Sequence, residues 1–235
     1  MSWTYEIALR GAPERGADVQ AWLETARNRW TGLPGLACVD VYTPAAGEAR
    51  DPYNHDGAGP LLMVMLDFAS RGALAAAVTG GAITAAAAAL APGIAATGAA
   101  FERRFYPTGK DATATLLQAP FSYVVRYHRP ADDEAAFVSN YLATHPATQA
   151  KLPGIRGVIC YVPVSGMHAD GPEGTGLPSA DYMIGNEVVF DDIGAFNAAM
   201  ASPVRDELRA HYRAFPRFTG INTHYPMTRR RLTEA

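Results

Sequence analysis

The two halves of this chain repeat one another, and that repeat limits its possible folds more than any other feature. Gly32–Gly47 reads GLPGLACVDVYTPAAG, and Lys151–Gly166 reads KLPGIRGVICYVPVSG. Each stretch has Leu-Pro-Gly, an apolar run that contains a tyrosine, a proline two residues after that tyrosine, and a closing glycine. The copies lie 119 positions apart, as Pro34 and Pro153 show. A long-period repeat of this kind indicates two structural units of one type.

The repeat extends along most of the chain, so we interpret it as a tandem duplication. We place the two units at residues 1–112 and 118–235, meeting near residues 111–119. Further pairs at the same spacing are Trp22-Leu23 with Tyr141-Leu142, Tyr42 with Tyr161, and Phe105–Pro107 with His224–Pro226. Leu66–Leu74 also matches Val188–Phe196 after a shift of three residues.

Each unit predicts the same order of elements. A strand rich in aromatic and β-branched residues opens the unit, and a helix follows it. Leu-Pro-Gly ends this helix, because the residue before a proline avoids the helical region and glycine turns freely. A second strand, a long loop, a third strand, one or two helices and a last strand complete the order β-α-β-β-α-β, which is the ferredoxin-like unit. We expect strands at 3–9, 61–68, 121–127 and 181–190, and first helices at 16–30 and 132–144.

A single ferredoxin-like sheet has helices on one face and leaves the other face open. Two such sheets cover each other when they pack face to face or close into an eight-stranded barrel. We therefore predict an α+β fold, in which two tandem ferredoxin-like repeats pack as an intramolecular dimeric-type α/β barrel.

Composition excludes several classes of protein. The net charge of -3 and the pI near 6.1 give no electrostatic footprint for nucleic acid. We expect the one basic cluster, Arg229–Arg231, to be a solvated tail. Cys38 and Cys160 fall in predicted strands, which favours buried, reduced thiols in a cytoplasmic protein. The N-terminal residues show no signal peptide pattern, and the longest uncharged stretch is too rich in alanine, glycine and proline for a membrane span.

The second half resembles a known family. Tyr141–Tyr161 reads YLATHPATQAKLPGIRGVICY, with a His-Pro pair in the first helix ahead of Leu-Pro-Gly and a strand. This pattern resembles the EthD domain of the dimeric α/β-barrel superfamily, here in a tandem-repeat form. The resemblance implies a protein of catabolic or biosynthetic pathways. Related barrels include cofactor-independent monooxygenases, isomerases, cyclases, decarboxylases and, more distantly, haem enzymes.

The histidine of the His-Pro pair is present in one half only, because His145 corresponds to Ala26. We expect Pro146 to distort the helix and to expose His145. A neutral imidazole can act as acid or base near pH 7, so His145 is the first catalytic candidate. The alternative is that His145 caps or packs the helix end beside Leu152.

The third strands differ in the same direction. Met63-Val64-Met65 of the first half corresponds to Gly185-Asn186-Glu187 of the second. Alternation places Asn186 and Glu187 on opposite faces, and either one could point into the barrel. A carboxylate in an apolar barrel would have a raised pKa and could pair with a histidine, so both residues are catalytic candidates. The alternative is a local hydrogen bond on a solvent-facing or helix-covered face.

Aromatic residues cluster on the first strand of the second half. Tyr123 and Tyr127 share one face, and Arg126 lies on the other. With Tyr161 they form our candidate substrate-binding set, because an aromatic lining suits a planar hydrophobic ligand. The alternative is ordinary core packing, and the match of Tyr161 with Tyr42 favours a structural role for that pair.

No motif points to a cofactor or a metal. The long loops at 45–60 and 164–181 contain His55 and His168, without a second histidine at metal-ligand spacing. Phosphate-binding, nucleophile-elbow and zinc-protease motifs do not occur. Haem would need an axial ligand such as His224 or His211, and nothing singles these out.

The stretch Gly72–Phe101 has no charged residue. We expect an alanine- and glycine-rich helical surface there, covered in a homodimer, although a coding bias toward alanine is the alternative. Our first hypothesis for function is an enzyme of the lyase, isomerase or cofactor-independent oxygenase type that acts on an aromatic or polyketide-like substrate, with His145 as acid or base. The alternatives are a non-catalytic ligand-binding or accessory protein and, third, a haem-binding barrel.

Overall fold

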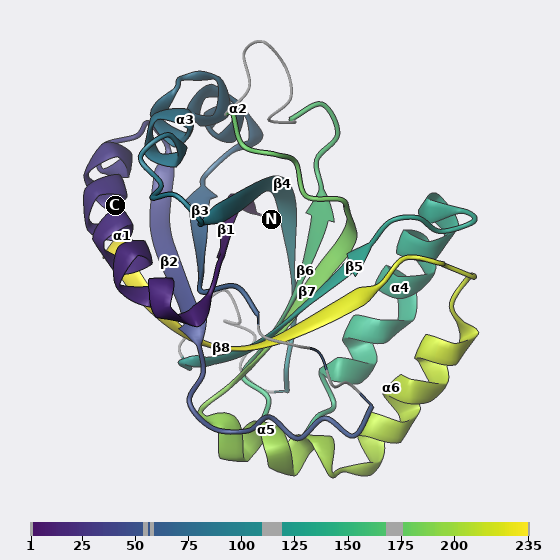
Figure 1. The fold of residues 1–235 in the computed structure, drawn as a ribbon. Coiled ribbons are helices and arrows are strands. Elements are labelled where there is room, and N and C mark those ends of the chain that lie inside the picture. Colours follow the sequence, from purple (N-terminus) through teal and green to yellow (C-terminus); the bar gives the residue numbers. More distant parts are fainter. Residues whose placement is uncertain (1, 54–55, 57–58, 110–118, 168–175, 235) are drawn as a thin grey trace.

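A computed structural model of the protein describes residues 2–53, 56, 59–109, 119–167 and 176–234 (Figure 1). Every predicted strand and first helix is present within a few residues of its expected bounds. The elements of the first half are β1 (Ser2–Arg10), a 3-10 turn (Pro13–Arg15), α1 (Gly16–Trp30), β2 (Leu36–Pro44), β3 (Leu62–Phe68), α2 (Arg71–Thr79), α3 (Ala82–Ala87) and β4 (Ala95–Tyr106). Those of the second half are β5 (Phe121–His128), α4 (Glu134–Gln149), β6 (Gly157–Pro163), β7 (Tyr182–Phe190), α5 (Ile193–Met200), α6 (Pro203–Ala214) and β8 (Asn222–Glu234).

The strands close into one antiparallel barrel in the order β1-β3-β2-β8-β5-β7-β6-β4. The first half contributes the run β4-β1-β3-β2, and the second half contributes the matching run β8-β5-β7-β6. The last strand of each half pairs with the second strand of the other, through β2–β8 and β4–β6. The predicted α+β barrel is therefore confirmed. The boundary predicted near residues 111–119 lies, except for Ala119, outside the described residues.

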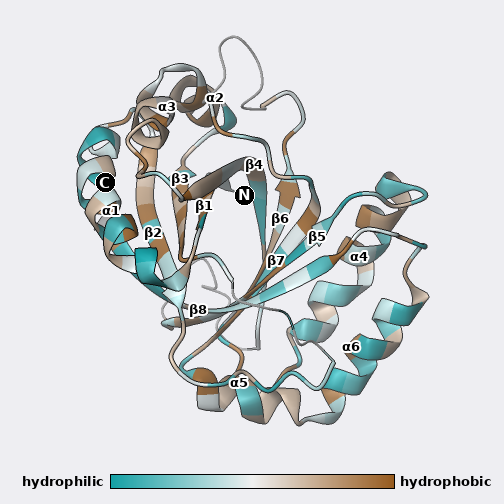
Figure 2. Ribbon diagram, in the orientation of Figure 1, coloured by the Kyte–Doolittle hydropathy of each residue, from teal (hydrophilic) through white to brown (hydrophobic). Residues whose placement is uncertain are grey.

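The barrel wall separates two kinds of core. Its outer face packs against helices, with α1, α2 and α3 over the first half and α4, α5 and α6 over the second (Figure 1). Its inner face forms a third cluster with contributions from both halves, including Tyr42 and Tyr161. Successive residues of a strand point to opposite faces, so each barrel strand supplies both cores. Brown, apolar segments accordingly follow most of the barrel strands in Figure 2.

Helix α4 carries the predicted His-Pro pair, and it corrects one expectation. Asp133 caps its N-terminus by accepting a hydrogen bond from the backbone of Ala136. The helix then continues through Pro146 to Gln149. His145 is buried at 7% exposure, so Pro146 neither ends the helix nor exposes the histidine.

The strand registers correct the alignment of the last strands. Ile7 of β1 pairs with Gly98, and its counterpart Val125 of β5 pairs with His224. Gly98 is thus the positional equivalent of His224, whereas the sequence match had paired His224 with Phe105. The helical region before the last strand is longer in the second half, which shifts β8 relative to β4 and makes the shared Tyr-Pro a misleading match.

Two surface expectations also change. Gly72–Phe101 is not one helical surface, because α2 and α3 are followed by β4 from Ala95. Arg229–Arg231 is not a solvated tail, because it belongs to β8, and Arg229 is buried against Asp40. Cys38 and Cys160 are buried free thiols, as expected. Among the described helices none is long and apolar enough to cross a membrane.

Candidate functional site between the sheet and helices of the second half

Three neighbouring strands place two polar side chains, Asn186 and His224, in one row on the outer face of the second-half sheet. Asn186 of β7 pairs with Val125 of β5, and Val125 pairs on its other side with His224 of β8. The three side chains therefore lie in one line across the sheet, beneath the covering helices. Tyr123 and Tyr127 share this face, as the alternation predicted, while Val124 belongs to the inner cluster.

Two helices place further polar residues over this row. His145 and Gln149 are four residues apart on α4, so they share one helix face. Arg205 and Arg209 are likewise four residues apart on α6. Together the sheet and the helices enclose a small, partly open pocket of about 60 Å³. Its lining consists of Asp51, Tyr123, Val125, Tyr127, His145, Gln149, Leu152, Asn186, Val188, Met200, Arg205, Leu208, Arg209, Tyr212, Asn222 and His224.

Several buried polar atoms in this pocket have no protein partner. Both side-chain atoms of Asn186, Nδ2 and Oδ1, are unpaired, and Asn186 is 0% exposed. Nδ1 of His145 and Oε1 of Gln149 are also unpaired. An unsatisfied buried polar group costs roughly 1–3 kcal/mol, so a cluster of them is kept where a bound molecule or water supplies the partners. These atoms make the pocket the candidate binding site of the described part of the chain.

The imidazole of His145 is neutral in this environment. Burial lowers its pKa to about 3, and electrostatic interactions with His211 and Arg205 act in the same direction. Aromatic rings account for the burial, since Tyr141 and Phe215 lie 4.8 Å and 5.4 Å from the imidazole, centroid to centroid. His145 is therefore available at neutral pH as an uncharged hydrogen-bonding group.

An ion pair closes one side of the pocket. Arg205 of α6 donates to both carboxylate oxygens of Asp51, with N–O distances from 2.7 to 3.1 Å. The hydroxyl of Tyr123 donates to the same carboxylate at 3.3 Å. Asp51 comes from the long loop of the first half, so both halves contribute to the site.

His224 has a carboxylate partner of its own. Its Nδ1 lies 2.6 Å from Oδ2 of Asp56, and its backbone N–H donates to the same oxygen. The His224 ring also stacks on Tyr123 at 5.7 Å between centroids. A carboxylate at Nδ1 favours a proton on that nitrogen, so Nε2 is the ring nitrogen turned away from Asp56. Nε2 lies 3.4 Å from Nδ2 of Asn222, another lining residue.

The equivalent region of the first half is apolar. The row equivalent to Asn186, Val125 and His224 is Val64, Ile7 and Gly98. Ala26 stands where the second half has His145, and Trp30 stands at the position of Gln149. Trp30 is fully buried and packs against Trp22. Apolar bulk thus fills the first half where the second half keeps polar atoms and space.

The other predicted catalytic residue, Glu187, lies on the opposite face of the barrel wall. It points into the barrel, where its carboxylate accepts hydrogen bonds from Ser122 at 2.5 Å, Tyr161 at 2.6 Å and Tyr42 at 3.3 Å. A pairing between Glu187 and His145 is therefore wrong. The carboxylate is already satisfied by three hydroxyl groups, which makes it part of the scaffold.

Two predicted substrate-binding residues also lie inside the barrel. Arg126 is fully buried and donates through Nε and Nη2 to Oε2 of Glu6, at 3.1 and 2.5 Å. The Glu6 carboxylate raises the pKa of Arg126 against the opposing effect of burial. Tyr161 lies under Arg126, 4.7 Å from ring centroid to guanidinium carbon, and burial raises its pKa. Neither residue lines the pocket with His145.

Gly185 explains why the second half lost the methionine found in the first. A Cβ atom at Gly185 would lie 2.7 Å from Nη1 of Arg126 and 2.9 Å from its Cδ. The guanidinium therefore occupies the space that Met63 fills in the first half. The absence of a side chain at Gly185 therefore leaves room for the ion pair between Arg126 and Glu6 inside the barrel.

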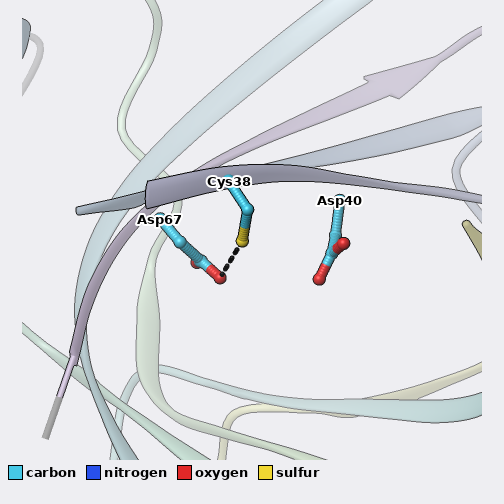
Figure 3. A group of neighbouring side chains, drawn as sticks. All are labelled: Cys38, Asp40 and Asp67. Carbon is cyan, nitrogen blue, oxygen red and sulfur yellow. Dashed lines mark hydrogen bonds between the residues drawn. The ribbon is translucent and has the colours of Figure 1, made fainter. Parts of the chain in front are cut away.

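A further group in the barrel, Cys38, Asp40 and Asp67, has the spacing of metal ligands (Figure 3). Each carboxylate already has a guanidinium partner: Arg103 pairs with Asp67, and Arg231 donates to Asp40 at 2.9 Å. Burial and Asp67 raise the pKa of the Cys38 thiol to about 12. A cation would have to displace two arginines and a thiol proton, so this group is an ion-pair network. His55 and His168 lie outside the described residues.

Sequence reasoning missed Asp51, Gln149, Arg205, Arg209 and His224 as site residues. The signal for His224 was present, because the second half has a polar residue where the first has an apolar one. The wrong alignment of the last strands hid it by pairing His224 with Phe105. Asp51, Arg205 and Arg209 have no such signal, because charged residues on loops and helices are common.

Comparison with known proteins supports the fold. No protein-family model and no curated protein sequence matches the chain. Among solved structures, an anthrone oxidase-like protein matches with a TM-score of 0.58 at 12% identity, covering 99% of this chain and 94% of the other. A proposed monooxygenase from Lactobacillus acidophilus NCFM matches with a TM-score of 0.54 at 12% identity, covering 99% and 97%. An EthD family protein from Bacillus halodurans C-125 matches 44% of this chain and 96% of its own at 20% identity, with a TM-score of 0.33.

Full-length matches of this kind define the class of fold. The chain has the dimeric α/β-barrel fold, with both barrel halves in one polypeptide. The EthD match covers less than half of the chain and carries no argument at that TM-score, so membership of the EthD family stays a prediction.

Proposed function

We propose that this protein is a small-molecule enzyme whose active site is the pocket between the sheet and the helices of the second half. One observation carries the proposal: Asn186 and His145 place three unpaired, buried polar atoms in a cavity for which the first half has only apolar equivalents. Scaffold residues seldom keep such atoms, because replacing them with apolar groups is stabilising. Substrate binding is the compensation that we infer.

The chemistry that fits this site starts with a proton transfer. Lyases, isomerases and cofactor-independent oxygenases can all begin by removing an acidic O–H or C–H proton. His145 accepts that proton: the substrate bond to hydrogen breaks, an N–H bond forms on the imidazole, and the electron pair stays on the substrate as an anion. The amide of Asn186 donates a hydrogen bond to the anion.

The lowered pKa of His145 sets a condition on this step. A general base works best when its pKa is near the working pH, and a pKa of about 3 is far below it. An anionic substrate beside the imidazole stabilises the protonated form and raises its pKa. His145 is therefore a competent base only in the complex, which protects the empty pocket from acquiring a buried charge.

Pocket size limits the substrate. A cavity of about 60 Å³ holds a few waters or the polar edge of one aromatic ring. The rest of an aromatic or polyketide-like substrate must lie toward the open side or displace side chains. Haem does not fit in this volume, so His224, with its Asp56 partner, is not proposed as an axial ligand.

A screen of hydroxyaromatic substrates with matched variants tests the enzyme proposal. His145→Gln keeps a hydrogen-bonding side chain but cannot take a proton, and Asn186→Val copies the first half. Both variants should lose at least about a hundredfold in turnover while remaining folded. Equal turnover by wild type and His145→Gln would exclude His145 as the base, and substrate binding without turnover would favour the alternative of a ligand carrier.

The surface of α2 and α3 supports a proposal about assembly. Ala76 of α2 is exposed, as are Ala88 and Ala89 just after α3, and Gly72–Phe101 contains no charged residue. Small side chains allow close helix packing, so we propose a homodimer through this surface. Sedimentation of wild type and Ala76→Glu tests it: the wild type should be a dimer and the variant a monomer. A monomeric wild type would contradict it.

A further inference from the structure

Arg205 and Arg209 lie one turn apart on α6, but only Arg205 is paired with a carboxylate of the described residues. Arg205 is bound by both oxygens of Asp51. Arg209 makes no ion pair with a carboxylate of the described residues, and its Nε is buried without a partner. The site thus contains one cation that is neutralised and one that is not.

Aromatic rings hold the Arg209 guanidinium in place. It lies 5.0 Å from the ring centroid of Tyr212 and 5.0 Å from that of Tyr53. Tyr53 is itself fixed by a hydrogen bond from its hydroxyl to Asp206, at 2.8 Å. A guanidinium stacked in this way keeps its N–H edge free for a planar, bidentate acceptor such as a carboxylate.

The charges that line the pocket leave a net positive value. Arg205 and Asp51, which both line the pocket, cancel. Asp56, the partner of His224, is not part of the lining. His145 is neutral, so the positive charge of Arg209 is the one that no carboxylate of the described lining compensates. Asn186 lines the sheet side of the same pocket. A substrate that matches these features has an anion at one end and a hydrogen-bonding group at the other.

We propose that the pocket selects a hydroxyaromatic carboxylate, whose carboxylate pairs with Arg209 and whose hydroxyl group lies against Asn186 and His145. This inference rests on the proposed function and deepens it. The hydroxyl is the group whose proton His145 removes, and the bound carboxylate supplies the negative charge that favours the protonated imidazole. The cavity admits the hydroxyl edge of the ring, and Arg209 holds the other end where the pocket is open.

Calorimetric titration with two probes of the same shape tests the charge requirement. The probes are 6-hydroxy-2-naphthoate, whose hydroxyl and carboxylate lie at opposite ends of the ring system, and its neutral amide, 6-hydroxy-2-naphthamide, on wild type, Arg209→Gln and Arg213→Gln. Arg213 is exposed on the same helix and controls for general loss of positive charge. Wild type and Arg213→Gln should bind the acid about tenfold more tightly than the amide, and Arg209→Gln should bind both equally.

Each other result counts against the inference. Equal binding of the two probes by wild type, no binding of either at millimolar concentration, or a preference for the acid that survives in Arg209→Gln would each overturn it. Failure of the enzyme proposal gives a different pattern: the acid binds through Arg209, but neither it nor other hydroxyaromatic acids are converted. A crystal of the Arg209→Gln protein, or its unchanged melting temperature, confirms that the variant is folded.

Discussion

Asn186 and Glu187 are adjacent on β7, yet they belong to different parts of the molecule. Glu187 points into the barrel and accepts three hydrogen bonds from hydroxyl groups. Asn186 points out toward the helices and has no side-chain partner. The same strand therefore contributes Glu187 to the hydrogen-bonded interior of the barrel and Asn186 to the pocket, where its polar atoms have no protein partner.

The first prediction separates these two roles by mutation. Asn186→Val should raise the free energy of unfolding by about 1 kcal/mol, because it removes two unpaired buried polar atoms, and it should abolish ligand binding. Glu187→Ala should lower the free energy of unfolding by about 2 kcal/mol or more, because it leaves buried hydroxyl groups without an acceptor. Urea titrations of both variants measure the difference. A destabilised Asn186→Val with intact binding would show that the residue is structural.

Arg126 provides the second prediction. Its partner Glu6 is 1% exposed, so each single variant, Arg126→Met or Glu6→Met, leaves an uncompensated charge in the barrel. Each should lower the free energy of unfolding by about 3–5 kcal/mol, and the double variant Glu6→Met/Arg126→Met should recover most of the loss. Chemical denaturation of the four proteins completes the cycle. Loss of ligand binding without loss of stability would return Arg126 to the substrate-binding set.

The third prediction concerns pH. The unfolded chain protonates this imidazole near its ordinary pKa of 6.5, whereas His145 in the folded protein stays neutral down to a pKa of about 3. Between these values the unfolded state binds more protons, so stability falls as the pH falls, by at most about 1.4 kcal/mol per pH unit from this group. His145→Gln should therefore lose less stability than wild type between pH 6.5 and pH 5. Parallel slopes for the two proteins would contradict a neutral, buried His145.

The fourth prediction concerns the tautomer of His224. The carboxylate of Asp56 lies 2.6 Å from Nδ1, so that nitrogen should carry the proton and Nε2 should face the pocket unprotonated. Nitrogen-detected NMR at pH 8 distinguishes the two tautomers directly. Asp56→Asn should weaken the preference, and a wild-type His224 with its proton on Nε2 would rule out the arrangement.

Much of the fold could be predicted from the sequence because the patterns that define its elements are local and occur in both halves. The apolar alternation of β5, the helical spacing of Trp22 and Leu23, and the two Leu-Pro-Gly stops each define an element without tertiary knowledge. The repeated sequence pattern then predicted a second sheet that covers the first. The placement of Tyr123 and Tyr127 on the helix side also followed from alternation.

The site could be predicted only where the halves differ. His145 and Asn186 stood out because Ala26 and Val64 replace them in the first half. Alternation could not decide which of Asn186 and Glu187 enters the barrel, because both strand faces are buried. The partners Asp51 and Arg205 meet across 154 residues of sequence, and only the closed barrel brings them together.

One NMR measurement tests the central claim most directly. The side-chain amide signals of Asn186, assigned by their loss in Asn186→Val, are followed while 6-hydroxy-2-naphthoate is added. The amide of Asn197, which is bonded to the backbone of Glu48 outside the pocket, is the internal control. We expect the Asn186 signals to shift to saturation while those of Asn197 stay fixed. Saturating binding that leaves Asn186 unmoved would contradict the assignment of this pocket as the active site.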